Sequence, residues 1–325
     1  MRPINPRPIG DSFSLKPYDR SLGAPRLRLL DQTDSPAAFT MIPLRDNIPS
    51  RTTPLVNYAL IGITAFAFVV QLLEPESEGG LVERLGMIPA RVVDPDAEIV
   101  IPTAVGKRIV YEERWTRDGI VRVPRVAYEV EDRPAEPSAV PPVLTPLTCI
   151  FLHGGWMHFL GNMWFLFIFG DNVEDRFGRG GYLAFYLASG VAASLSHLVT
   201  DPQSTVPTIG ASGAIAGVMG AYLVSYPHAR VMTLIPIFYI IRIEVLPAPI
   251  FLGIWFVIQL FQGVAAVTSV QTTGVAWWAH IGGFAVGAGI AWMLDKWHWL
   301  RPRRDSVPLS SQRLRPVRRR HPRSF

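Results

Sequence analysis

Apolar residues gather into six separate runs along this chain, and each run is close to the length of a membrane-spanning helix. A helix needs about 20 apolar residues to cross the roughly 30 Å hydrocarbon core of a bilayer. The fourth run is short and rich in glycine and alanine. The pattern predicts an all-α integral membrane protein with a bundle of six transmembrane helices. The six runs cover residues 55–73, 151–170, 182–199, 211–226, 246–264 and 277–294.

Two segments between the runs have a different pattern. Residues 231–241 are apolar but too short to span a membrane, and Pro236 interrupts them, so we expect a strand-like or interfacial segment there. Alternating apolar and polar residues flank the turn sequence Asp118-Gly119, which predicts two hairpin strands. We therefore expect an extramembrane insertion over residues 74–147 that contains short β-strands.

The composition agrees with a membrane protein and excludes several classes of site. The chain has 325 residues, of which 49% are hydrophobic and 18% charged, whereas about a quarter of a soluble domain is charged. Residues 181–294 contain only four Lys, Arg, Asp or Glu. A single cysteine, Cys149, excludes an internal disulfide and a cysteine-based metal cluster. No histidine pair has the spacing of a zinc motif and no glycine-rich phosphate loop is present, so we expect no metal and no cofactor.

The distribution of charge predicts the orientation of the chain. Lys and Arg near the ends of spans favour the cytoplasmic side. Residues 1–54 carry eight basic and five acidic side chains and residues 295–325 carry ten and two, whereas residues 74–150 carry nine and fourteen. We therefore expect a cytoplasmic tail (1–54), a membrane core (55–294) with the outer insertion, and a basic, disordered cytoplasmic tail (295–325).

The same charges bear on location and partners. A polar, proline-rich tail of more than fifty residues precedes the first run, so that run is not a signal peptide. The basic C-terminal tail is better explained as a topology determinant in contact with anionic lipid than as a nucleic-acid-binding segment. We expect a multi-pass protein of a cell membrane, specifically a bacterial inner membrane, with both termini in the cytoplasm.

Four polar side chains within the apolar runs are the main functional candidates: His158, Asn162, Ser212 and His280. Polar groups at membrane depth are costly and are functional candidates by default. In the predicted topology the second, fourth and sixth runs all pass from outside to inside, and each of the four residues lies near the start of one of them. His158 and Asn162 are four residues apart and share one helix face. All four side chains are therefore expected at one level in the outer leaflet.

A hydroxyl and an imidazole at one depth predict a nucleophilic hydrolase site. A serine needs a neighbouring base to accept its proton, and an imidazole performs this near neutral pH. We therefore expect Ser212 to be the nucleophile and His280 the general base. Free backbone N–H groups at the start of a helix, with the side chains of His158 and Asn162, could stabilise an oxyanion. No Asp or Glu lies in the outer halves of these runs, which favours a Ser–His dyad.

Small residues surround both members of this dyad. Gly210 and Gly213 flank Ser212, and Gly283 and Gly287 follow His280. Small residues at such spacings allow two helix backbones to approach closely. Taken alone these glycines favour a plain packing interface, but His280 at the matching depth favours a site.

These residues stand in motifs that together resemble those of the rhomboid intramembrane serine proteases. The resemblance covers residues 55–73 and 148–294 and implies a six-helix core, with the nucleophile at Ser212 and the base at His280. It also implies oxyanion donors at His158 and Asn162, and cleavage of membrane-anchored protein substrates within the lipid bilayer. The motifs are His153-Gly154-Gly155-Trp156-Met157-His158, Gly161-Asn162-Met163, Phe169-Gly170 with Val173-Glu174, Gly210-Ala211-Ser212-Gly213-Ala214, Ala279-His280-Ile281-Gly282-Gly283 and Leu85-Gly86-Met87-Ile88-Pro89-Ala90.

The resemblance also assigns residues outside the dyad and shows a departure. Glu174 and Gly178 match positions that are structural in the family. Many relatives carry an aromatic residue one turn after the serine, stacked on the catalytic imidazole, and this chain has Ala216 there. Trp277 or Trp278 is the candidate to compensate.

The leading hypothesis is an intramembrane serine endopeptidase that cleaves transmembrane or juxtamembrane segments of membrane-anchored proteins. The alternative is a catalytically inactive rhomboid-like membrane chaperone or substrate-binding factor. A transporter is disfavoured because the chain shows no internal repeat. Among the other histidines, His153 is expected to brace the loop before the second helix. The sequence leaves the oligomeric state open.

Overall fold

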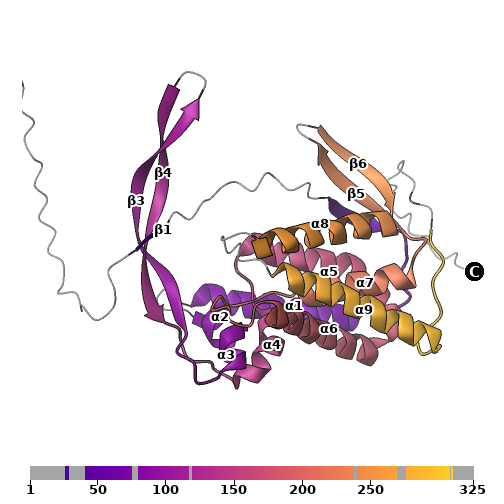
Figure 1. Cartoon of the computed structure of the whole chain (residues 1–325). Coiled ribbons are helices and arrows are strands. Elements are labelled where there is room, and N and C mark those ends of the chain that lie inside the picture. The colour runs from indigo at the N-terminus through magenta and orange to yellow at the C-terminus, as the bar shows by residue number, and fades with distance from the viewer. Residues whose placement is uncertain are drawn as a thin grey trace, which may run out of the picture. The chain divides into compact units, whose positions relative to one another are not determined.

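The computed structural model of this chain describes residues 26–28, 41–74, 80–116, 119–237, 240–268, 276–307 and 309. The chain divides into two compact units, Met1–Thr33 with Val100–Pro134 and Asp34–Ile99 with Ala135–Phe325. The first unit contains a three-stranded sheet, and helices dominate the second (Figure 1). Most of the two predicted tails lies outside the described residues.

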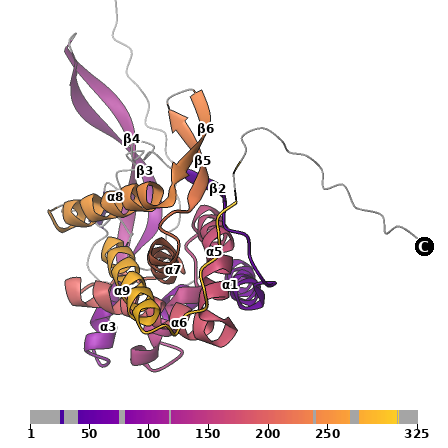
Figure 2. The same cartoon turned by 90° about the vertical axis from the view of Figure 1, so that its right-hand side faces the viewer.

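All six apolar runs form helices in the second unit. In the middle of these, α7 is surrounded by α5, α6, α8 and α9 (Figure 2). The second predicted helix begins at Trp156 and not at residue 151. Gly154 and Gly155 prevent an earlier start, and Gly155 has a φ of +153°. Short helical turns over Pro142–Phe151 precede that break and are bent by 80° from the helix that follows. The helices are α1 (Leu55–Leu73), α5 (Trp156–Phe177), α6 (Arg179–Thr200), α7 (Ser212–Ser225), α8 (Ala248–Thr268) and α9 (Trp277–Lys296).

Fewer helices meet the requirements for a complete membrane span. Among the described residues, α1 and α6 are long and apolar enough to cross a membrane, and the bent pair ending in α5 makes up to three. The 14 residues of α7 extend only about 21 Å. The structure therefore has six core helices, while the predicted count of six spans is met only in part.

Four segments of the chain meet at one end of the helix bundle. The backbone N–H of Arg301, after α9, donates to the carbonyl of Arg176 at the end of α5 (2.9 Å). Val307 N–H donates to the carbonyl of Asn47, which precedes α1 (2.9 Å). Asn47 Oδ1 accepts from the N–H of Arg230, after α7 (2.7 Å). The segments before α1 and after α5, α7 and α9 therefore meet at one end of the bundle.

A second sheet lies at that end and was predicted only in part. It consists of β2 (Ile42–Asp46), β5 (Arg230–Ile237) and β6 (Ile240–Pro247), all antiparallel, in the order β2-β5-β6. The strand-like segment expected at 231–241 is confirmed, but the hairpin continues to Pro247 and α8 begins only at Ala248. The predicted all-α description is therefore met only in part, because it omits this β2–β5–β6 sheet.

The first unit contains the predicted hairpin. Strands β3 (Val100–Thr116) and β4 (Gly119–Pro134) pair antiparallel, and Thr116 is opposite Gly119, which has a φ of +122°. The turn lies where it was predicted, but the strands have 17 and 16 residues and are much longer than the short strands expected. Because each residue adds about 3.3 Å to a strand, the hairpin is a long extended element (Figure 1).

One strand pairing is at odds with the predicted topology. The strand β1 (Arg26–Arg28) pairs with residues 128–130 of β4. Since β1 precedes α1 and β4 follows it, this pairing and a membrane-crossing α1 cannot both hold with the tail inside and the insertion outside.

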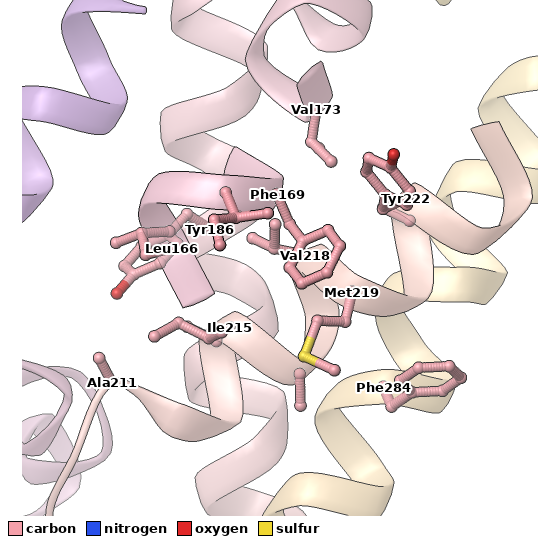
Figure 3. Packing of buried hydrophobic residues seen from close by; sticks show 14 of the residues in the cluster. Leu166, Phe169, Val173, Tyr186, Ala211, Ile215, Val218, Met219, Tyr222 and Phe284 are labelled. Atoms are coloured by element: carbon pink, nitrogen blue, oxygen red, sulfur yellow. The ribbon is translucent and has the colours of Figure 1, made fainter. Parts of the chain in front are cut away.

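The backbones of α7 and α9 approach each other closely. A Cβ atom on Gly283 would collide with the carbonyl oxygen of Gly213, and one on Gly287 would collide with the backbone of Gly217. The glycines therefore serve the close approach that the sequence predicted. On its other faces α7 is covered by larger side chains, such as Phe169 of α5, whose ring meets Tyr222 edge-on at 5.0 Å (Figure 3).

We predict that Gly287→Ala destabilises the protein by about 1–3 kcal/mol, because the added methyl group must push α9 away from α7. Gly289→Ala is the matched control in the same helix, since nothing lies within 4 Å of the position that its Cβ would occupy, and it should cause no loss. Thermal unfolding in detergent measures both. Equal effects of the two substitutions would contradict the proposed helix contact.

Candidate active site

Ser212 is the first residue of α7, and the loop before it is held by backbone hydrogen bonds. Met87 and Thr208 exchange two such bonds of 3.0 and 2.7 Å, and the N–H of Gly210 donates to the carbonyl of Cys149 (2.9 Å). Thr148 Oγ1 also donates to the carbonyl of Leu85 (2.6 Å). The segment around Met87, which carries one of the quoted motifs, therefore helps to fix the serine loop.

Gly210 is required at its position for two reasons. Its φ of +121° is a conformation that other residues rarely adopt. A Cβ atom there would also lie 2.7 Å from Nε2 of His158. The absence of a side chain at residue 210 thus allows the His158 ring to lie beside the loop that carries Ser212.

Three side chains from three helices form a line of hydrogen bonds. Ser212 Oγ lies 2.8 Å from Nε2 of His280, and Nδ1 of His280 lies 2.6 Å from Oε1 of Gln259. An amide oxygen can only accept, so the ring proton belongs on Nδ1 and Nε2 is free to accept the serine proton. The arrangement leaves Ser212 with a base in position.

Gln259 was missed by the sequence analysis. It comes from α8, is only 7% exposed and occupies the position that an acidic residue would take in a Ser–His–Asp triad. A signal existed, because Gln259 and Gln262 are the two amide side chains in the otherwise apolar segment 246–264. The predicted site drew only on polar residues of the second, fourth and sixth runs.

Tryptophans flank the imidazole where relatives have an aromatic residue on α7. Ala216 is buried and offers no ring. Trp277 lies edge-on to His280 with ring centroids 6.0 Å apart, and Trp255 of α8 lies 6.1 Å away on a tilted plane. Trp277 is one of the two residues expected to compensate, and Trp255 was not predicted.

The four predicted site residues surround one cavity of about 480 Å³. Asn162 is 8% exposed, and its Nδ2 lies 2.9 Å from Nε2 of His153. An amide nitrogen carries two N–H donors, so a second remains for the cavity. His158 lines the same cavity. The structure therefore brings His158 and Asn162 together with Ser212 and His280.

The expected supporting roles of three further residues are confirmed. The backbone of His153 exchanges hydrogen bonds of 3.0 and 3.1 Å with the side chain of Gln71 at the end of α1, which braces the loop. Glu174 accepts from the N–H of Asn57 (2.8 Å) and so caps the start of α1. Gly178, with a φ of +72°, forms the sharp turn between α5 and α6.

Comparison with known proteins agrees with this geometry. Residues 142–297 match the family model described as Rhomboid domain. Residues 142–297 are therefore identified as a rhomboid domain. The rhomboid domain contains Ser212, His280, His158, Asn162 and also Gln259, whereas α1 and the β3–β4 hairpin lie outside the matched residues.

Several curated relatives share parts of this domain. The chain is 42% identical over 77 residues to RHOMBOID-like protein 5 of Arabidopsis thaliana, covering 24% of this chain and 25% of the relative. It is 29% identical over 157 residues to Rhomboid-like protein 11, chloroplastic, of the same plant, covering 46% and 52%. Rhomboid protease GluP of Bacillus subtilis is 43% identical over 77 residues, covering 24% and 15%. The chain thus spans about half or less of the length of these relatives.

We predict that Gln259→Leu lowers kcat by about tenfold or more, because His280 then loses the acceptor that fixes its orientation and its Nδ1 proton. Gln259→Glu keeps an acceptor and should retain most of the activity. Gln262→Leu, one turn further along α8, is the matched control and should leave turnover unchanged. Turnover of a membrane-anchored reporter measures all three, and full activity of Gln259→Leu would remove Gln259 from the site.

Proposed function

We propose that this rhomboid-family protein is an intramembrane serine endopeptidase that cleaves transmembrane or juxtamembrane segments of membrane-anchored proteins. The observation that carries the proposal is the 2.8 Å separation between Ser212 Oγ and Nε2 of His280. The rhomboid domain supports it, because the family consists largely of such proteases. The orientation of His280 by Gln259 supports it as well.

The chemistry follows from the placement of each group. Ser212 Oγ attacks the carbonyl carbon of the substrate peptide bond while its proton passes to Nε2 of His280. The oxyanion is stabilised by backbone N–H groups at the start of α7 and by the side chains of His158 and Asn162. His280 then gives the proton to the leaving amine, and the C–N bond breaks to leave an acyl-enzyme. A water molecule, deprotonated by His280, hydrolyses that ester and restores Ser212.

A non-catalytic membrane chaperone is the alternative, and Ala216 is the observation in its favour. An imidazole without its usual stacking partner could be poorly held. In this chain, Gln259, Trp255 and Trp277 hold the ring from other directions, and we therefore favour the enzyme.

We predict that Ser212→Ala and His280→Ala each lower cleavage of a single-pass membrane reporter at least about a thousandfold. Ser225→Ala, a buried serine at the opposite end of the same helix, should retain activity. A fluorophosphonate probe should label the wild-type chain and Ser225→Ala but not Ser212→Ala. A folded protein that is never labelled and never cleaves would favour the chaperone.

We propose that the protein lies in a bacterial inner membrane, with the segment before α1 and the segment after α9 on the cytoplasmic side. Support comes from the basic residues in these segments and from their mutual hydrogen bonds. This placement puts the Ser212 cavity toward the opposite face.

We predict that a cysteine at Val143, which is exposed, reacts with a membrane-impermeant maleimide on intact cells. A cysteine at the exposed Trp299 should react only after permeabilisation. The native Cys149 is buried and should stay unlabelled. Cysteines at Leu27 and Val121 report on β1 and β4, and labelling of both from outside would overturn the cytoplasmic placement of the N-terminal tail.

A further inference from the structure

Strand β6 forms one edge of the β2–β5–β6 sheet. Within the described part of the chain, no strand pairs with the side of β6 that faces away from β5. Ile241 and Ile243 on this strand are 69% and 59% exposed, and the β5–β6 hairpin projects past the helices in Figures 1 and 2. An exposed edge of β-branched residues is a template for another strand, and unpaired backbone groups are especially costly beside a bilayer.

The register of the hairpin shows which backbone groups face outward. Ile237 and Ile240 are its last pair, with two residues between them. In such a hairpin the closing pair exchanges its own hydrogen bonds, and the pairs then alternate along the ladder. The backbone N–H and C=O groups of Ile241, Ile243 and Val245 therefore point away from β5, toward the free edge.

The charges on β6 are self-complementary. We propose that β6 of a second copy of this chain pairs antiparallel with this edge, around a twofold axis at Ile243. In that register Arg242 lies opposite Glu244 of the second copy, and Glu244 lies opposite its Arg242. Both side chains are exposed, and cross-strand pairs of opposite charge stabilise a sheet. The outward groups of Ile241, Ile243 and Val245 then pair with those of Val245, Ile243 and Ile241 of the second copy.

The neighbouring registers are disfavoured by the same residues. A shift by two residues places Arg242 opposite Arg242, or Glu244 opposite Glu244, and like charges directly opposite destabilise a sheet. A shift by one residue aligns outward groups with groups already bonded to β5. The sequence of β6 therefore favours one isologous contact between two identical chains.

The membrane constrains this contact further. The twofold axis at Ile243 is perpendicular to the sheet. Two copies with the same orientation in one bilayer are related by an axis along the membrane normal, so the sheet and its hairpins would lie parallel to the membrane surface. Ile241, Ile243 and Val245 of both strands then lie on one face of a six-stranded sheet. Such an apolar face suits the boundary between headgroups and acyl chains.

The test is cross-linking of the full chain in liposomes through Ile243→Cys with a short bis-maleimide. With Arg242 and Glu244 unchanged, the Ile243→Cys chain should give a covalent dimer on a denaturing gel. Trp292→Cys, an exposed position on α9, is the control and should give none. Arg242→Glu in the Ile243→Cys chain should raise the dimer dissociation constant by about tenfold or more, because both ion pairs become repulsive. Glu244→Arg should do the same.

Complementation separates pairing from any damage to the fold. The double variant Arg242→Glu/Glu244→Arg restores opposite charges and should dimerise like the wild type. Chains with Arg242→Glu carry two acidic side chains on β6 and chains with Glu244→Arg carry two basic ones, so a mixture should form heterodimers although neither forms homodimers. No cross-link at residue 243 in the wild-type background overturns the proposal, as does a cross-link that ignores the charge of residue 242.

Discussion

The contact between the backbones of α7 and α9 is the constraint on which the site depends. Ser212 and His280 are 68 residues apart in the chain, yet Oγ and Nε2 are within 2.8 Å. Both residues lie in the first turn of their helices, so their distance follows directly from the distance between the helix axes. Gly283 and Gly287 of α9 lack the side chains that would collide with the backbone of α7 and separate those axes. A packing device used for helix association in membranes here also sets the distance between the proposed nucleophile and its proposed base.

The frame around this contact fixes the remaining groups before any substrate arrives. At the end of the bundle near Ser212, the serine loop is bonded to the segment around Met87 and to the short helical turns before α5. Farther down, Tyr182 donates to Oδ1 of Asn57 (2.8 Å), and Nδ2 of Asn57 donates to the carbonyl of Leu166 (3.1 Å). These buried polar groups are satisfied by one another, as they must be where water is scarce. Side chains held in this way are pre-organised for the site they support.

The sequence was sufficient for the helices and for the dyad, because both depend on local signals. The run at 55–73 coincides with α1, since Pro54 and Glu74 bound an uninterrupted apolar segment. The run at 151–170 was placed too early, because Phe151 and Leu152 are apolar although Gly154 and Gly155 break the helix. The depth of polar residues predicted that Ser212 would lie near His280.

What the sequence did not reveal depends on pairing between distant segments. The second strand of the β5–β6 hairpin was assigned in part to the fifth helix, because Leu246 is apolar, although Ile241 to Glu244 alternate with the period of a strand. The pairing of β2 with β5 joins residues far apart in the chain and leaves no local signal. Gln259 was overlooked for a related reason, since an amide in an apolar run acquires its meaning only when its partner is known.

The β2–β5–β6 sheet also has a consequence for the site at the opposite end of the bundle. The hairpin is the connection between α7, which carries Ser212, and α8, which carries Gln259. Its neighbour β2 is anchored by Asp46, whose carboxylate accepts from Tyr222 of α7 (2.6 Å) and from Asn172 of α5 (2.8 Å). Burial, with a smaller contribution from the nearby Asp171 carboxylate, raises the pKa of Asp46 to about 7.

Because its folded-state pKa is raised, Asp46 favours the folded state most when it is protonated, and its contribution declines as pH rises through 7. Above pH 7 the Asp46 carboxylate is negatively charged, and the groups that donate to it, Tyr222 and Asn172, are neutral. The anchoring of β2 beside the α7–α8 connection is therefore weaker when Asp46 is charged. Gln259 of α8 is hydrogen-bonded to His280. Movement of the α7–α8 connection would therefore shift α8 and, through Gln259, the His280 ring.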